Sequence, residues 1–239
     1  MKINYIIATW SGIRRNSEEN QPYYKDVLKN HVRTLAATEN NISQITIMKP
    51  FNPAGNSDYY NIELNNKIKI VDYKNEYQSY GQWLGATKLF LKEFDYFIFI
   101  EDDYVPCIDN FDSRLIDMYQ EGTYLCSLAK KYLNRYEMHC ALSNGLVSRQ
   151  TIAPLLLNHD YKECFNRYHS EFPRLTYRGK NYQRAFSKYL IENGITLKDY
   201  TEFYNADYYR NNKVHSYFRK NKTDREKIFT PIQSIFKPV

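Results

Sequence analysis

The pattern of hydrophobic and polar positions predicts strands and helices that alternate through the first half of the chain. Short apolar runs between polar loops are typical of buried strands, and apolar residues repeating every three or four positions are typical of an amphipathic helix. Strands are predicted at 3–8, 44–49, 67–73 and 96–100, a polar loop at 50–66, and helices at 23–38 and 79–94. Pro22 suits the first helical position of one helix, and Ser79 is the predicted cap of the other.

The second half of the chain is less regular. Its pattern predicts a helix at 111–120, a strand at 123–129, a turn at 143–145, a short helix from Thr151, and a helix at 182–193 that stops at Gly194. Apolar strands that alternate with helices predict an α/β fold, a mostly parallel sheet with helices on both faces.

Three polar segments follow strands of the predicted sheet. They lie at 9–12, 72–75 and 101–103, after the first, third and fourth strands. Ligands of such sheets bind beyond the carboxyl ends of the strands, so we expect these segments to converge on one crevice.

Length and composition favour one compact unit. With 239 residues the chain can bury one full core, and we expect a domain over 1–209 followed by a basic C-terminal extension over 210–239. No segment resembles a signal peptide or a membrane span, which leads us to expect a cytoplasmic protein. The four cysteines form no CxxC pair and are expected to be free thiols.

Positive charge is concentrated near the C-terminus. The whole chain carries a formal charge of +6, and 210–227 holds seven basic residues against two acidic ones. Such a tail suits phosphates, peripheral contact with an anionic membrane, or nucleic acid, although a solvated charged end explains it equally well. The 24 tyrosines offer flat apolar faces suited to sugars and bases, but composition alone decides little.

Glu101, Asp102 and Asp103 end an unbroken apolar run. Adjacent carboxylates repel one another, and the cluster becomes favourable when a divalent cation with a phosphate-bearing ligand lies among them. The alternative is that the acids simply solvate a loop. Neither GxGxxG nor GxxxxGK[ST] occurs, which argues against a dinucleotide fold and a P-loop.

The acids and the residues after them resemble a known family. Glu101, Asp102, Asp103 and Tyr104, followed by Asn110 and Phe111, are similar to the EDD form of the DXD motif in GT-A fold nucleotide-sugar glycosyltransferases, notably the N-acetylglucosaminyltransferase I family. The segment 79–103 also resembles family 2 enzymes of that Rossmann-like fold, and the resemblance covers about the first half of the chain. It implies that Asp103 ligates Mn²⁺ or Mg²⁺ and that Glu101 and Asp102 hold the ribose or the donor sugar.

The same resemblance suggests roles for other residues. Thr9 and Trp10 follow the first strand, where the family binds base and ribose, and Trp10 either stacks on the base or packs in the core. Asp72 either accepts a hydrogen bond from uracil or caps a turn. The segment 143–146 resembles a glycine-containing loop beside the donor sugar, although an ordinary turn explains it as well. His215 either completes the metal shell or is an ordinary surface or packed histidine.

The catalytic base is the point where the chain departs from the family. An inverting transferase needs a carboxylate near the acceptor hydroxyl. The family places it just before a helix ending in glycine, a position near Tyr182 and Gln183 here, and Gln cannot act as a base. Glu171 is the first candidate, with His169 and Asp199 as alternatives. A retaining mechanism, with the Gln183 amide near the sugar, is also open.

The sequence therefore predicts a metal-dependent glycosyltransferase that moves a sugar from a nucleoside diphosphate donor, UDP-linked by expectation, to a hydroxyl of a glycan or lipid-linked acceptor. A sugar-nucleotide nucleotidyltransferase is the alternative enzyme. A binding module for nucleic acid or glycan is the alternative from another class, and acids at a strand exit suit nucleic acid poorly.

Overall fold

A computed structural model describes most of the chain. The described residues are 1–9, 27–51, 57–63, 65–74, 76–102, 104–106, 108–126, 129–132, 135–140, 144–171, 178–199, 214–215 and 218–220. Within these ranges, only the backbone is described for 129–140, 169–171, 178–181, 199 and 214–220.

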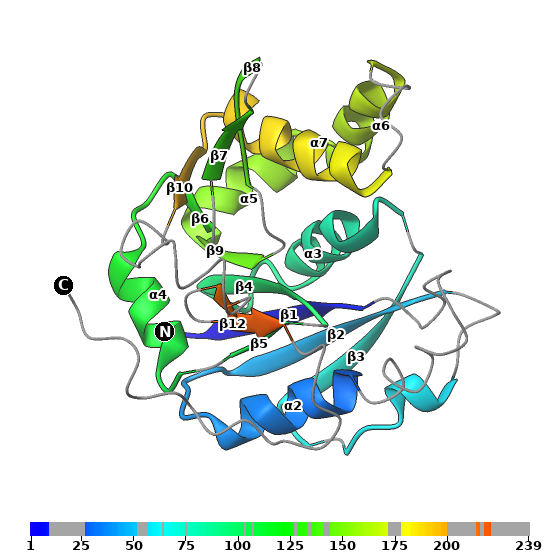
Figure 1. Cartoon of the computed structure of the whole chain (residues 1–239), viewed down its shortest axis with the longest axis vertical. Helices are drawn as coiled ribbons and strands as arrows, with labels where there is room; N and C mark the ends of the chain where they lie inside the picture. The colour runs from blue at the N-terminus through cyan, green and yellow to red at the C-terminus, as the bar shows by residue number, and fades with distance from the viewer. Residues whose placement is uncertain are drawn as a thin grey trace.

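A seven-stranded sheet forms the centre of the molecule (Figure 1). Its strands, in spatial order, are β10 (Thr196–Asp199), β6 (Thr123–Cys126), β9 (Asn144–Ser148), β4 (Tyr96–Glu101), β1 (Ile3–Ala8), β2 (Gln44–Pro50) and β3 (Ile68–Tyr73). Strand β9 runs antiparallel to both of its neighbours, and every other pair in the sheet is parallel. The predicted α/β class with a mostly parallel sheet is confirmed.

Helices cover both faces of this sheet. One hydrophobic cluster joins α2 (Val27–Ala37) and α4 (Phe111–Met118) to one face. A second cluster joins α3 (Gln78–Leu89), α5 (Arg149–Asn158), α6 (Tyr161–Glu171) and α7 (Arg178–Glu192) to the other. Figure 1 shows α2 below the sheet and α3 above it. The alternation of side chains along β4 explains the two clusters, because Phe97 and Phe99 belong to one and Ile98 and Ile100 to the other.

Two smaller sheets lie outside the central one. Strands β7 (Ala129–Tyr132) and β8 (Arg135–Cys140) form an antiparallel hairpin. Strand β5 (Tyr104–Pro106) pairs with β12 (Phe218–Lys220), which pairs with β11 (Val214–His215). Part of the basic extension thus returns to the strand that follows the acids.

Several predicted details are wrong. Ser79 does not cap α3: the cap position is Tyr77, without a side-chain hydrogen bond, and Ser79 lies in the first turn. Asn144 and Gly145 lie in β9 rather than in a turn, and Ser143 lies outside the described residues. The helix predicted at 182–193 begins at Arg178, so Tyr182 and Gln183 lie inside α7 rather than before it. The predicted polar loop at 50–66 contains a 3₁₀ helix, η2 (Ser57–Tyr60), and α6 was not predicted.

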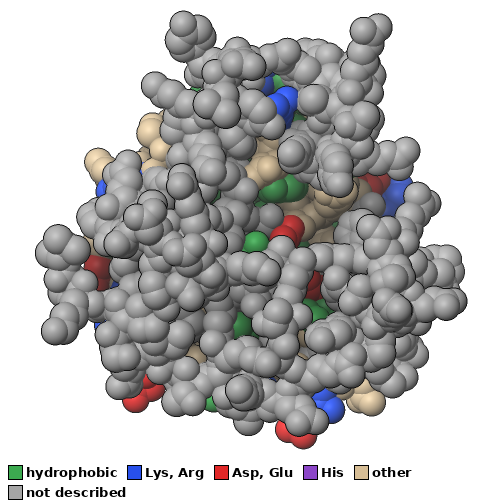
Figure 2. Space-filling model, in the orientation of Figure 1, with side chains coloured by type: hydrophobic (Ala, Val, Ile, Leu, Met, Phe, Trp, Pro, Cys, Tyr) green, Lys and Arg blue, Asp and Glu red, His purple; other side chains and the backbone are tan. Residues whose placement is uncertain are grey.

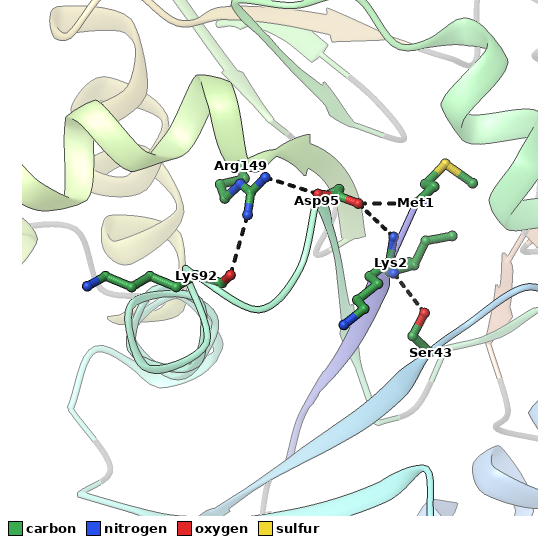
Figure 3. A network of polar contacts seen from close by, with 7 residues as sticks. Met1, Lys2, Ser43, Lys92, Asp95 and Arg149 are labelled. Atoms are coloured by element: carbon green, nitrogen blue, oxygen red, sulfur yellow. Dashed lines mark hydrogen bonds and ion pairs between the residues drawn. The ribbon is translucent and has the colours of Figure 1, made fainter.

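A polar cluster ties the amino ends of the strands together (Figure 3). The carboxylate of Asp95, just before β4, accepts hydrogen bonds from the backbone N of Lys2 at 2.8 Å and from Nη2 of Arg149 at 3.1 Å. The backbone N of Ile3 donates to the hydroxyl of Ser43 at 3.2 Å. This cluster lies at the amino ends of the strands, whereas Glu101 lies at the carboxyl end of β4.

Candidate functional site

The acidic segment lies at the point where the strand order reverses. From β1 the chain proceeds to β2 and β3 on one side, and the next strand, β4, pairs with β1 on the other side. In α/β sheets the crevice for a ligand opens at such a switch point, beyond the carboxyl ends of the strands. The register places Ala8 of β1 beside Glu101 of β4, so Thr9 and Glu101 both lie at this edge.

The first half of α3 holds both strand ends. The Gln82 side chain accepts a hydrogen bond from the backbone N of Thr9 at 2.9 Å and donates to the Thr9 carbonyl at 3.0 Å. The indole N–H of Trp83 donates to the carbonyl of Ile100 at 3.0 Å. Helix α3 thereby sets the relative position of β1 and β4 at the candidate site.

Glu101 faces the α3 side and is partly exposed. The hydroxyl of Ser79 donates to its Oε1 at 2.7 Å. Ser79 follows two residues in the left-handed backbone region, Tyr77 with φ 60° and Gln78 with φ 55°, a conformation that is costly for residues other than glycine. Figure 2 shows red acidic atoms near the middle of this view of the molecule.

Asp102 points to the opposite side and is only 5% exposed. Its carboxylate accepts a hydrogen bond from the hydroxyl of Tyr59 in η2. Its backbone N donates to the carbonyl of Ala8 at 3.0 Å. Adjacent acids of the motif thus have different environments: Glu101 bonds to Ser79 of α3, whereas Asp102 is buried and bonds to Tyr59 of η2.

Thr9 and Asp72 are brought together around Tyr60. The hydroxyl of Thr9, which is buried, lies 2.6 Å from the hydroxyl of Tyr60 and donates to the carbonyl of Met48 at 2.6 Å. Asp72 is exposed at the end of β3 and forms an ion pair with Lys49 at 3.7 Å. Burial raises the pKa of Tyr60 well above its usual value, and the negative charges of Asp102 and Asp72 raise it further, against a lowering by the Thr9 hydrogen bond. Tyr60 therefore stays neutral, next to Thr9 and near Asp72.

Other predicted site residues are placed only by their backbone or lie outside the described residues. Trp10 and Asp103 belong to the latter group. His215 lies in β11, opposite Phe218, which in turn lies opposite Pro106 of β5. Two strand spacings, about 10 Å, therefore separate His215 from the strand that follows the acids.

The candidate bases lie on two elements. Glu171 is the last residue of α6, which also contains His169. Asp199 ends β10, and because β10 and β6 run parallel to β4, it lies at the same edge of the sheet as Glu101. The side chains of these three residues lie outside the described part, so their roles stay predictions.

Sequence reasoning missed several polar residues of this edge. Tyr59, Tyr60 and Gln82 were not singled out, and Ser79 was assigned to a cap rather than to Glu101. A usable signal existed for Gln82, a polar residue next to Trp83 on a helix with an apolar stripe. No comparable signal existed for the tyrosines, which lie in a predicted loop rich in Asn and Pro.

Two features are absent from the described part of the chain. No cluster of three or more histidines, cysteines and acids suited to a metal ion occurs there, and neither Asp103 nor the His215 side chain belongs to that part. No helix in the described ranges combines the length and the apolar character that a membrane crossing requires.

Comparison with known proteins adds no assignment. No model of a known protein family matches the sequence, and no curated protein is significantly similar to it. The functional reading therefore depends on the geometry of the site.

Proposed function

We propose that the protein is a metal-dependent glycosyltransferase that uses a nucleoside diphosphate sugar. The observation that carries the proposal is the partly exposed carboxylate of Glu101, at the carboxyl end of β4 and beside Ala8, the last residue of β1. This is the switch point of a mostly parallel sheet, where a nucleotide is expected to bind.

The carboxylate among the proposed metal ligands suits a hard divalent cation. Mn²⁺ and Mg²⁺ prefer oxygen ligands and are often shared between one or two carboxylates and the phosphates of a substrate. Glu101 remains the proposed contact to the ribose or the donor sugar. Asp103 and His215 remain the proposed direct ligands. The metal, when bound, would stabilise the charge of the departing diphosphate.

The nucleotide of the donor would lie over the ends of β1, β2 and β3. The buried hydroxyl of Thr9 would position the partly exposed Tyr60 there, and Asp72 supplies an exposed carboxylate at the same level of the sheet. These groups accept and donate hydrogen bonds of the kind that a ribose and a pyrimidine base offer. Asp102, held by Tyr59, would support this part of the site rather than contact the sugar directly.

Thermal unfolding with Mn²⁺ and UDP tests the donor and metal site. Ligands that bind only the native state stabilise it, so Mn²⁺ and UDP together should raise the melting temperature by more than the sum of their separate effects. Asp103→Asn should abolish this coupled shift. Asp95→Asn, at the opposite edge of the sheet, is the matched control and should retain it. Absence of any coupled shift in the unaltered protein would overturn the proposal.

A screen of nucleotide sugars with Mn²⁺, read out as donor hydrolysis, tests the reaction. Glu171→Gln should remove transfer while leaving UDP binding intact, because a base acts on the acceptor and not on the donor. Glu163→Gln, on the same helix and exposed, is the control. Release of pyrophosphate from a nucleoside triphosphate would instead identify a nucleotidyltransferase, and steeply salt-dependent binding to duplex nucleic acid would identify a binding module.

A further inference from the structure

A buried chain of hydrogen bonds links β1, α2 and the acidic segment. The hydroxyl of Tyr5 lies 2.9 Å from Nε2 of His31, and Nδ1 of His31 lies 3.0 Å from the carbonyl oxygen of Asp102. Tyr5 and His31 are both fully buried. The chain joins residues that are 26 and 71 positions apart in the sequence.

The direction of these hydrogen bonds follows from their chemistry. A carbonyl oxygen carries no hydrogen, so Nδ1 of His31 must be the donor to Asp102. In a neutral ring Nε2 then carries no hydrogen and accepts from the Tyr5 hydroxyl. A neutral ring that donates from Nδ1 and accepts at Nε2 satisfies both of these contacts.

The bond from His31 acts on the backbone that leads to the next acid. The carbonyl of Asp102 and the amide of Asp103 belong to one planar peptide group. A hydrogen bond that holds the carbonyl therefore also holds the orientation of that amide. On its other side, Asp102 is held by its backbone N, which donates to Ala8. Its carboxylate is held by Tyr59. Three elements outside β4 thus hold this one residue: β1, α2 and η2.

We propose that His31 is a positioning residue that orients the peptide group between Asp102 and Asp103, with Tyr5 fixing the ring tautomer that this requires. The consequence for metal binding rests on the proposed function, whereas the consequence for the backbone does not. Residues that orient metal ligands from behind typically change metal affinity by about 10-fold to 100-fold when altered. His31 would therefore matter for the cation without touching it.

Nitrogen NMR of the histidine rings tests the tautomer in the unaltered protein. The proposal requires that His31 carry its proton on Nδ1 and that Tyr5→Phe perturb the Nε2 signal. A ring protonated on Nε2 alone would overturn it, since that form cannot donate to the Asp102 carbonyl.

Substitution of His31 tests the positioning role. His31→Leu removes the N–H donor and keeps a side chain of similar size. His31→Asn keeps an N–H donor near the position of Nδ1. The N–H of Asp102 donates to Ala8 and belongs to the same residue as the carbonyl that His31 holds, so it reports loosening of this residue. Its exchange, measured against Phe99 in the middle of β4, should accelerate by about 10-fold or more in His31→Leu and recover in part in His31→Asn. Leu35→Ala, a buried truncation in the same helix, is the matched control and should lower stability without this selective change.

The same variants separate the two proposals. If the unaltered protein shows coupled binding of Mn²⁺ and UDP, His31→Leu should weaken it by about 10-fold to 100-fold, and His31→Asn should weaken it less. If the unaltered protein shows no such coupling, the proposed function fails, and the exchange at Asp102 still decides the role of His31. Equal exchange at Asp102 in His31→Leu and Leu35→Ala would overturn the positioning role.

Discussion

At the scale of single residues, Gln82 has a larger structural role than its polarity suggests. Its side chain is 1% exposed and bonds to both backbone groups of Thr9, in the way that a neighbouring strand would. Without it the backbone N–H of Thr9 loses its partner at the end of β1. A buried group left without a hydrogen bond costs about 1–3 kcal/mol.

Gln82→Ala should therefore lower the free energy of unfolding by about 1–3 kcal/mol, measured by urea unfolding. Lys88→Ala, an exposed truncation in the same helix, should change stability by less than about 0.5 kcal/mol. Similar effects of the two substitutions would contradict the assigned role of Gln82.

Cys164 illustrates how burial controls reactivity. Burial raises the pKa of its thiol to about 11, so the native protein keeps this thiol protonated at neutral pH. An unfolded cysteine ionises near pH 8.5. Between these two values the unfolded chain releases a proton that the native protein retains, and the contribution of Cys164 to stability therefore falls as the pH rises through this window.

The expected result is slow alkylation of Cys164 by iodoacetamide at pH 8 in the native protein and fast alkylation in urea, since the thiolate is the reactive form. Mass spectrometry of the peptide that contains Cys164 provides the measurement. Labelling of the native protein at the rate of the unfolded one would show that the thiol is not protected.

At the scale of elements, the antiparallel strand β9 depends on a glycine. A Cβ atom on Gly145 would lie 2.5 Å from the Tyr124 hydroxyl and 2.6 Å from the backbone oxygen of Leu125, both in β6. The sequence left open whether this glycine admits a ligand or belongs to an ordinary turn. In the structure the space is used by the neighbouring strand instead.

Gly145→Ala should destabilise the protein by about 1–3 kcal/mol through overpacking, measured by thermal or urea unfolding. Adding Tyr124→Leu should recover only part of the loss, because the backbone oxygen of Leu125 cannot withdraw. Full recovery would mean that the Tyr124 ring is the whole obstacle.

At the scale of the whole molecule, the two ends of the parallel strands carry different polar groups. Glu101, Asp102, Thr9 and Tyr60 lie at the carboxyl ends, whereas Asp95 joins Lys2 and Arg149 at the amino ends (Figure 3). The second cluster ties the start of β1 to the segments that begin β4 and α5. It should therefore contribute to stability and leave ligand binding unchanged.

Asp95→Asn should lower the free energy of unfolding by about 1 kcal/mol, a modest value because the carboxylate is 39% exposed and water screens its ion pair with Arg149. Urea unfolding measures the loss. The same variant should bind Mn²⁺ and UDP with unchanged affinity, and a large change in that affinity would show that the two ends are coupled.

Much of the fold follows from local pattern. The strands at 3–8, 44–49 and 67–73 were predicted to within a residue at each end, and β4 and α4 were placed correctly. The errors concern places where tertiary contacts override local preference. Ser79 has the character of a helix cap but bonds to Glu101, and Gly145 has the character of a turn residue but lies in a strand beside Tyr124.

The sequence by itself determined the alternation of strands and helices and the placement of acids at a strand exit, since periodicity and polarity are local properties. Only the tertiary structure decided how those acids differ. Glu101 meets Ser79 of α3, whereas Asp102 is buried between Tyr59 and His31, which lie 43 and 71 positions away along the chain. Such partners are selected by the packing of whole elements against the sheet, and no short stretch of sequence carries that information.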